Sequence, residues 1–238
     1  MKRFPSPGTL SLRFRRNGTK LEKTSLSTDV FTGPCGGNPF HLSAFLEHPC
    51  FPYKNLRRKI KHMLNNKSQS DRIYLRPMGI ADTDKIIAWR NKDRVRRNFV
   101  YQEPFTQEGH RNWIRTQIEP GHAVQFIICE KSGDRAVGSV YFRDIDEEKG
   151  CAEYGIFIGE DDALGKGYGT RAAELALAYA FEKLKLRTVF LRVFADNTGA
   201  RRSYEKAGFQ LIKDKQENVV INEVVREMVF YEIKIEKD

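Results

Sequence analysis

Gly165-Lys166-Gly167-Tyr168-Gly169-Thr170 lies between an apolar segment, Tyr154 to Ile158, and a helical pattern that begins near Thr170. Three glycines in five positions let the backbone turn sharply and approach a ligand closely. A helix that starts behind such a loop presents unpaired N–H groups and the positive end of its dipole. The stretch therefore predicts a seat for a phosphate or pyrophosphate group.

Two familiar phosphate loops do not fit this stretch. The Walker pattern has four residues between its first glycine and a Gly-Lys-Ser/Thr, and the chain has no such string. The dinucleotide fingerprint has Gly-x-Gly-x-x-Gly early in a βαβ unit, whereas Gly-x-Gly-x-Gly stands late in this chain. Taken alone, the loop is equally compatible with an ordinary glycine-rich turn between a strand and a helix.

The composition of the 238 residues is that of a globular protein, with 40% hydrophobic residues. We find no apolar run long enough to cross a membrane, and the charged N-terminus lacks the apolar stretch of a secretory signal. The cysteines follow no metal-binding spacing. We therefore expect a cytoplasmic protein without a metal, whose reduced thiols are Cys35, Cys50, Cys129 and Cys151.

The net charge of +10 is distributed unevenly. Residues 1–62 hold 12 Lys/Arg and 3 Asp/Glu, whereas the rest of the chain holds 29 and 28. We therefore expect neither a nucleic-acid nor a membrane partner for the main domain. Residues 1–70 read as a basic, disordered extension and residues 71–238 as the domain. Two alternatives remain open for this extension: a tail that meets an acidic partner or a membrane surface, and sequence upstream of a later start at Met63.

The hydrophobic periodicity of the main domain predicts a mixed α/β sheet with helices on both faces. Strands are expected at 72–77, 123–129, 136–145, 151–158, 188–194, 210–215 and 225–234. Helices are expected from about 83, 94, 106, 170 and 198, the last one capped by Asp196 or Asn197 and stopped by Gly208.

A second motif follows the loop by about 30 residues: Asn197-Thr-Gly-Ala-Arg-Arg-Ser-Tyr204-Glu-Lys-Ala-Gly208-Phe209. The two motifs in this order, separated by a long helix and an apolar strand, resemble the GCN5-related N-acetyltransferase (GNAT) family over residues 72–235. Its nearest branch would be that of the ribosomal-protein and amino-sugar-nucleotide acetyltransferases. The resemblance implies a mostly antiparallel sheet of about seven strands with a splayed strand pair. It also implies acetyl-CoA as co-substrate and a primary amine as acceptor.

The resemblance assigns the donor site residue by residue. The pyrophosphate of CoA would lie on the loop, and the pantetheine arm would pair with the splayed strand, where one amide would stabilise the oxyanion. Asn197 would cap its helix and could also bind CoA. The expected cofactor-binding residues are Ile156, Phe157, Ile158, Leu164, Gly165, Lys166, Gly167, Tyr168, Gly169, Thr170 and Asn197.

Amide formation needs a neutral amine, yet free alkylamines have a pKa of about 10. Glu153 is the candidate general base, and the alternative is a cross-strand partner for an arginine. Tyr204 is the candidate acid that protonates the departing thiolate, and the alternative is a core aromatic. Because the chain has no Gly-x-Ser-x-Gly nucleophile elbow, direct transfer without an acyl-enzyme is expected.

The acceptor pocket is expected in the first helices, where arginines and aromatic residues cluster. Such a set suits a nucleotide diphosphate with a stacked base, so the expected acceptor is an amino sugar on a nucleotide carrier. A polyamine or a protein N-terminus is the alternative. A polyamine would need acidic walls, whereas the acidic clusters Glu160-Asp161-Asp162 and Asp144 to Glu148 are interpreted as solvated loops. A non-catalytic acyl-CoA sensor and a homodimer also remain open. The candidate substrate-binding residues are Trp89, Arg90, Asn91, Arg94, Tyr101 and Phe105.

Overall fold

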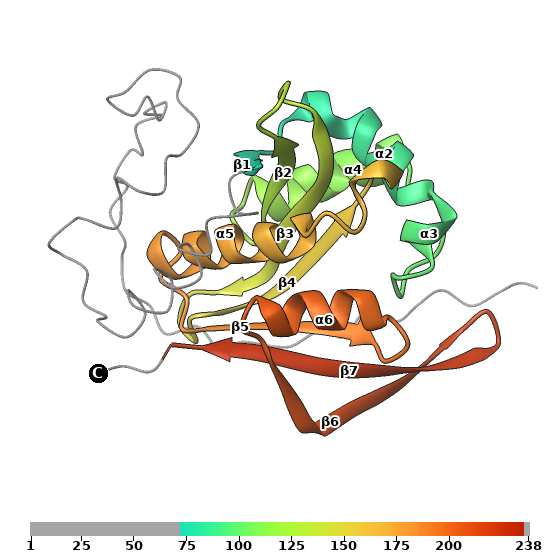
Figure 1. Cartoon of the computed structure of the whole chain (residues 1–238), viewed down its shortest axis with the longest axis vertical. Helices are drawn as coiled ribbons and strands as arrows, with labels where there is room; N and C mark the ends of the chain where they lie inside the picture. The colour runs from blue at the N-terminus through green and yellow to red at the C-terminus, as the bar shows by residue number, and fades with distance from the viewer. Residues whose placement is uncertain (1–71, 236–238) are drawn as a thin grey trace, which may run out of the picture. The chain divides into compact units, whose positions relative to one another are not determined.

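The structure, a computed structural model, describes residues 72–235, so the expected extension at 1–70 lies outside the described residues. Its strands form one sheet in the order β1-β2-β3-β4-β5-β7-β6 (Figure 1). The strands are β1 (Ile73–Pro77), β2 (Val124–Glu130), β3 (Ala136–Asp146), β4 (Cys151–Ile158), β5 (Thr188–Phe194), β6 (Gln210–Ile221) and β7 (Val224–Lys234). Every neighbouring pair is antiparallel except β4 and β5, which confirms the expected mixed, mostly antiparallel sheet.

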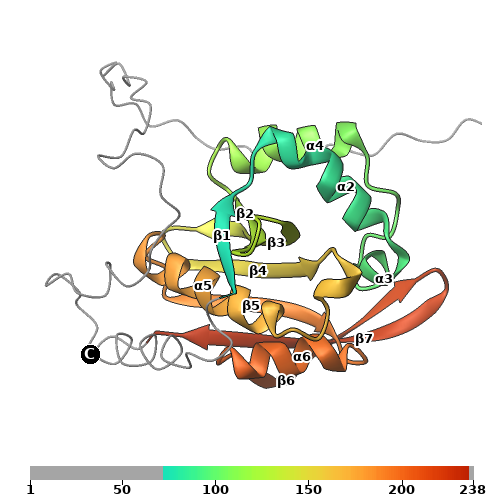
Figure 2. The ribbon, with the colours of Figure 1, turned by 45° about the horizontal axis from the view of Figure 1, so that its top comes forward.

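Helices cover both faces of this sheet, as expected (Figure 2). In β2, Phe126 and Ile128 belong to the larger hydrophobic cluster with α5, whereas Ile127 and Cys129 pack in a second cluster with α2. Because successive side chains of a strand point to opposite faces, α5 and α2 lie on opposite sides. The helices are α2 (Thr83–Asn91), α3 (Asp93–Arg96), α4 (Gln107–Trp113, continued by a π-helical turn at Ile114–Ile118), α5 (Tyr168–Glu182) and α6 (Thr198–Lys206).

The glycine loop turns directly into α5, which begins at Tyr168, two residues before the predicted start. Gly165 and Gly167 have φ angles of 72° and 78°, a region that side chains with a Cβ rarely adopt. Ala173, Leu177 and Phe181 form a buried stripe along this helix. No helix among residues 72–235 is both long and apolar enough to cross a membrane.

The C-terminal hairpin is longer than the sequence predicted. The sequence predicts that β6 ends near Lys215, before the polar residues Gln216 to Asn218, but the strand runs on to Ile221 and pairs with β7. Most of its side chains are exposed, since β6 is the edge strand of the sheet. The tight turn at Asn222 and Glu223, with φ angles of 48° and 67°, joins the two strands. A polar edge strand has no hydrophobic alternation to reveal it.

The pairing of β4 with β5 stops early, and this break positions the functional site. Only Cys151–Glu153 pairs with Thr188–Phe190. Beyond Glu153 the two strands diverge, whereas β4 keeps its pairing with β3 as far as Ile158. The predicted splayed pair is therefore present, and it leaves one edge of β4 unpaired within the sheet.

We expect Gly138→Ala to destabilise the domain by about 1–3 kcal/mol. A Cβ at this position in β3 would overlap the carbonyl oxygen of Phe157 and lie 3.1 Å from the Cα of Ile158. Gly199→Ala is the matched control, because a Cβ there would have no neighbour within 4 Å. Chemical denaturation measures both variants. Equal free energies of unfolding would contradict the close β3–β4 contact.

Candidate active site

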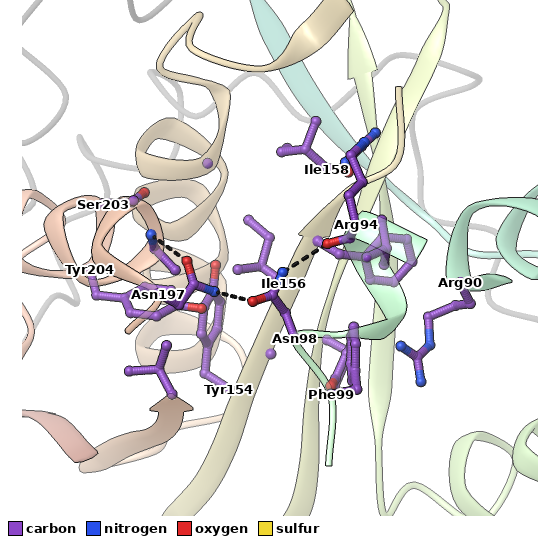
Figure 3. A pocket seen from close by; sticks show the side chains of 18 of the residues that line it. Arg90, Arg94, Asn98, Phe99, Tyr154, Ile156, Ile158, Asn197, Ser203 and Tyr204 are labelled. Atoms are coloured by element: carbon purple, nitrogen blue, oxygen red, sulfur yellow. Dashed lines mark hydrogen bonds between the residues drawn. The ribbon is translucent and has the colours of Figure 1, made fainter. Parts of the chain in front are cut away.

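A cavity of about 1000 Å³ occupies the fork between β4 and β5. Side chains from both faces of the sheet line it. Tyr154 of β4 belongs to the cluster that packs with α5, and Phe157 to the cluster that packs with α2. The cavity therefore has one compartment beside α5 and α6 and a second compartment beside α2, α3 and α4. Tyr204 of the first compartment and Arg90 of the second are labelled in Figure 3.

The glycine loop forms one end of this cavity. The amides of Tyr168, Gly169 and Thr170 belong to the first turn of α5, where intrahelical partners are missing. These groups and the helix dipole favour an anion at this end. Lys166 points elsewhere, since its ammonium lies 3.8 Å from both Glu130 and Asp162. The other predicted loop residues, Leu164, Gly165, Gly167, Tyr168, Gly169 and Thr170, line the cavity.

Along the unpaired edge of β4, every second residue directs its backbone N–H and C=O groups toward the cavity. The carbonyl of Phe157 faces Gly138 of β3, and the amide of Gly159 donates to Val137 at 2.8 Å. Because a strand alternates its hydrogen-bonding direction, the amides of Ile156 and Ile158 are those directed into the fork. Phe157 reaches the cavity with its side chain, while its backbone is directed at β3.

Tyr204 lies on α6 at the wall of the cavity and is 7% exposed. Its ring packs edge-to-face on Tyr154, with centroids 6.2 Å apart. Burial raises the pKa of Tyr204 well above its usual value of 10. The phenol is therefore neutral at physiological pH and holds a proton that it can donate.

Glu153 is the last residue of β4 that pairs with β5, so its side chain stands at the base of the fork. Arg143 donates to its carboxylate at 2.8 Å, and Arg192 donates at 3.1 Å. The arginine contact that the sequence left as an alternative is thus present, from both neighbouring strands. These two guanidinium groups fix the orientation of the carboxylate, and its role as a base stays a prediction.

Asn197 is the N-cap of α6, as predicted. Its Oδ1 accepts from the amide of Ala200 at 3.2 Å, and its Nδ2 donates to Asn98 at 3.0 Å (Figure 3). Asn98 follows α3, so this bond joins the helices on either side of the cavity. Arg226 adds a second link, because it donates to the carbonyl of Arg97 and to Asp196.

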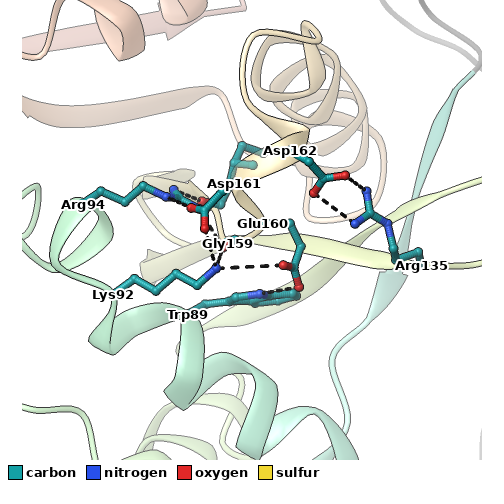
Figure 4. Close-up of polar contacts among 9 residues, drawn as sticks. Trp89, Lys92, Arg94, Arg135, Gly159, Glu160, Asp161 and Asp162 are labelled. Carbon is teal, nitrogen blue, oxygen red and sulfur yellow. Dashed lines mark hydrogen bonds and ion pairs between the residues drawn. The ribbon is translucent and has the colours of Figure 1, made fainter.

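Four of the six predicted acceptor residues line the cavity: Arg90, Arg94, Tyr101 and Phe105. Trp89 does not, since it is 2% exposed and its indole packs on Gly159 and donates to Glu160 at 3.0 Å (Figure 4). Asn91 also lies outside the lining. Its Nδ2 donates to the carbonyl of Phe105, and its Oδ1 accepts from the amide of Phe105. These two residues support the wall of the cavity from behind.

The acidic segment between β4 and α5 forms ion pairs with lysine and arginine side chains (Figure 4). Asp161 pairs with Lys92 and Arg94, and Asp162 receives two hydrogen bonds from Arg135 at 3.0 and 2.7 Å. Neither Asp161 nor Asp162 lines the cavity. Within residues 72–235, no group of three or more His, Cys, Asp and Glu is arranged to hold a metal ion.

Several lining residues escaped the sequence reasoning, among them Tyr141, Arg143, Arg192 and Ser203. Tyr141 pairs with Gly155, and its ring occupies the space that a Cβ at Gly155 would need. The signal was the register of β3 on β4, which places Tyr141 and Arg143 on the face of Glu153. Ser203 exchanges a hydrogen bond with Thr170 at 3.0 Å and so fastens α6 to α5.

Residues 72–210 match the family model described as the acetyltransferase (GNAT) domain. The chain belongs to this GNAT family. It is an acyl-CoA-dependent N-acetyltransferase with acetyl-CoA as its co-substrate, which sets aside the non-catalytic sensor. A solved structure with the same fold is the spermidine N-acetyltransferase of Vibrio cholerae in complex with CoA and spermine. It has a TM-score of 0.63 and 23% identity, and the match covers 70% of this chain and 97% of that one.

The chain is also similar to curated N-acetyltransferases, some of which are named for spermidine as acceptor. The chain is 32% identical to the probable N-acetyltransferase YjcK of Bacillus subtilis over 163 residues, which covers 64% of this chain and 88% of the relative. It is 28% identical to the spermidine N(1)-acetyltransferase of Escherichia coli over 150 residues, covering 63% and 79%. These relatives do not specifically support the predicted ribosomal-protein and amino-sugar branch.

We expect Tyr204→Phe to lower kcat on the order of 100-fold while leaving acetyl-CoA binding largely intact, because only the phenolic proton is lost. The matched control is Tyr179→Phe, whose ring packs on Phe126 at 4.8 Å, outside the cavity lining. Release of free thiol measures turnover and calorimetry measures binding. An unchanged turnover would remove Tyr204 from the mechanism.

Proposed function

We propose that this acetyltransferase transfers the acetyl group to the primary amine of an amino sugar on a nucleotide carrier, that is, to an anionic acceptor. The charge of the cavity carries this proposal. Glu153 is the single acid among the described residues of the lining, and its charge is balanced by Arg143 and Arg192. The other cations of the lining are Arg90, Arg94, Arg97, Arg202 and Lys206.

In the proposed reaction the pyrophosphate of CoA rests on the amides of the glycine loop. The pantetheine arm runs along the unpaired edge of β4, which brings the thioester into the fork. The amine attacks the thioester carbon from the compartment beside α2 and α4. An amide of β4 stabilises the resulting oxyanion. Collapse breaks the C–S bond, and Tyr204 gives its proton to the departing thiolate.

Glu153 is the proposed acceptor, through a water molecule, of the proton that the attacking amine loses. Its carboxylate stands at the base of the fork, where the two compartments meet, and the two arginines hold it there. The proton lost by the amine and the one given to sulfur then balance over a turnover.

Glu153→Gln tests this role, since the amide keeps the size of the side chain but cannot take up a proton. We expect kcat to fall on the order of 100-fold. Glu174→Gln is the control, because Glu174 is also a half-buried acid paired with an arginine, Arg171 at 2.9 Å, but lies on α5 outside the lining. Thiol release near neutral pH measures both variants. Wild-type turnover of Glu153→Gln would exclude Glu153 as the base.

A polyamine is the second candidate acceptor, and the names of the spermidine acetyltransferases among the relatives favour it. A polycation would need acidic walls, however, and the acids Asp161 and Asp162 are paired with cations outside the lining. The protein N-terminus remains a third alternative, and the homodimer stays a prediction.

An amine panel distinguishes these acceptors. We expect thiol release from acetyl-CoA with a uridine-diphosphate-linked amino sugar to exceed that with spermidine or a peptide with a free N-terminus by at least about tenfold in kcat/KM. The reason is that the cationic lining attracts an anion and repels a polyamine. Mass spectrometry identifies the acetylated product. Preferred acetylation of spermidine would overturn the proposed acceptor and leave the acetyltransferase activity intact.

A further inference from the structure

Arg90 differs from the other half-buried arginines of the cavity because it has no acidic partner. Arg94 pairs with Asp161, whereas Arg143 and Arg192 pair with Glu153. Within residues 72–235, no carboxylate lies within ion-pair distance of Arg90, and its buried Nη1 has no hydrogen-bond partner. A buried guanidinium without a counter-ion is costly, so the fold alone gives no reason for it.

Aromatic rings hold this guanidinium in place. Its central carbon lies 3.3 Å from the centroid of the Phe99 ring and 5.4 Å from that of Phe105. Both rings line the cavity with Arg90, and Phe99 and Arg90 are labelled in Figure 3. Cation–π contacts fix the position of the guanidinium but leave its buried Nη1 without a hydrogen-bond partner. Burial accordingly lowers the pKa of Arg90 to about 10, so it still carries its charge at neutral pH.

Tyr141 adds a neutral donor to the same cavity. Its phenol lies over Gly155 of β4, where the hydroxyl oxygen would overlap an added Cβ. Burial raises the pKa of Tyr141, so its hydroxyl stays protonated. A ligand in the compartment beside α2 therefore meets a fixed cation and a hydroxyl donor on the way to the site of transfer.

We infer that Arg90 and Tyr141 form the anion-recognition site of the acceptor, in which the guanidinium binds a phosphate oxygen and the phenol donates a second hydrogen bond. The inference rests on the proposed function. It assigns phosphate binding to Arg90 because Arg94, Arg143 and Arg192 already have carboxylate partners. It makes Arg90 the residue that selects a phosphorylated amine over a neutral or cationic one, since a guanidinium matches the geometry of phosphate.

Binding of uridine 5′-diphosphate to the CoA-saturated protein tests the site directly, because bound CoA blocks the phosphate seat on the glycine loop. We expect Arg90→Met to weaken this binding at least about tenfold relative to wild type. Arg90→Lys should retain part of the affinity, since lysine keeps the positive charge but lacks the planar arrangement of the guanidinium N–H donors. Arg111→Met, which removes an exposed arginine of α4 outside the lining, is the matched control and should bind as wild type does.

Unchanged binding of uridine 5′-diphosphate to Arg90→Met, with CoA binding and the thermal transition preserved, would overturn the site. If Arg90→Met unfolds, the decision passes to Arg90→Lys, and for that variant wild-type affinity overturns the site whereas intermediate affinity supports it.

Kinetics separates this inference from the proposed function. We expect wild type to favour the nucleotide-linked amino sugar over the same free sugar, and Arg90→Met to lose that preference through a raised KM. If the linked sugar is acetylated with the same preference by both proteins, the Arg90 site fails and the proposed function stands. If wild type acetylates only spermidine, the proposed function fails, and the binding of uridine 5′-diphosphate decides the site by itself.

Discussion

The early end of the β4–β5 pairing is the constraint on which the rest of the site depends. Continued pairing beyond Glu153 would consume the amides of Ile156 and Ile158 and close the cavity. Contacts at both ends of the diverging strand stabilise the fork. Arg192 of β5 donates a hydrogen bond to Glu153 at the base of the fork. Arg94 donates to the carbonyls of Ile158 and Gly159 at the open end of the fork, at 2.8 and 2.7 Å. The edge of β4 is thus free for a ligand, while the carbonyls at the end of the strand already have hydrogen-bond partners.

The fork also divides the chemistry between two faces of one strand. Tyr154 points to the side of α5 and α6 and supports Tyr204, whereas Glu153 and Phe157 point to the side of α2 and α4. A donor that enters over the glycine loop and an acceptor that enters from α2 therefore meet only in the gap. This arrangement suits direct transfer, because each substrate has its own compartment and the reacting atoms share the opening between them.

Local motifs were predictable and long-range contacts were not. The loop, the start of α6 and the cap by Asn197 follow from contiguous residues, and β4 and β5 have the predicted bounds. The roles of Trp89 and Asn91 depend on partners far along the chain, so a lone sequence pattern suggested ligand contacts instead. Tyr141 became visible only through the register of β3 on β4. The length of β6 was not apparent from the sequence because its middle, Lys213 to Asn218, is polar and exposed and shows no alternation of hydrophobic residues.

The near-neutral charge of the domain conceals a local excess of positive charge in the cavity lining, on which the proposed choice of acceptor depends. Acids and bases along the sequence nearly cancel, but in the structure Asp161 and Asp162 are paired with cations away from the lining. Arg90 faces the cavity without such a partner. Similarity to spermidine acetyltransferases extends over the fold, whereas the proposed choice of acceptor depends on a few side chains of the cavity lining. Arg90 is half-buried and has no carboxylate partner, and an incoming anion would compensate its charge, which is the physical basis of the proposed anionic acceptor.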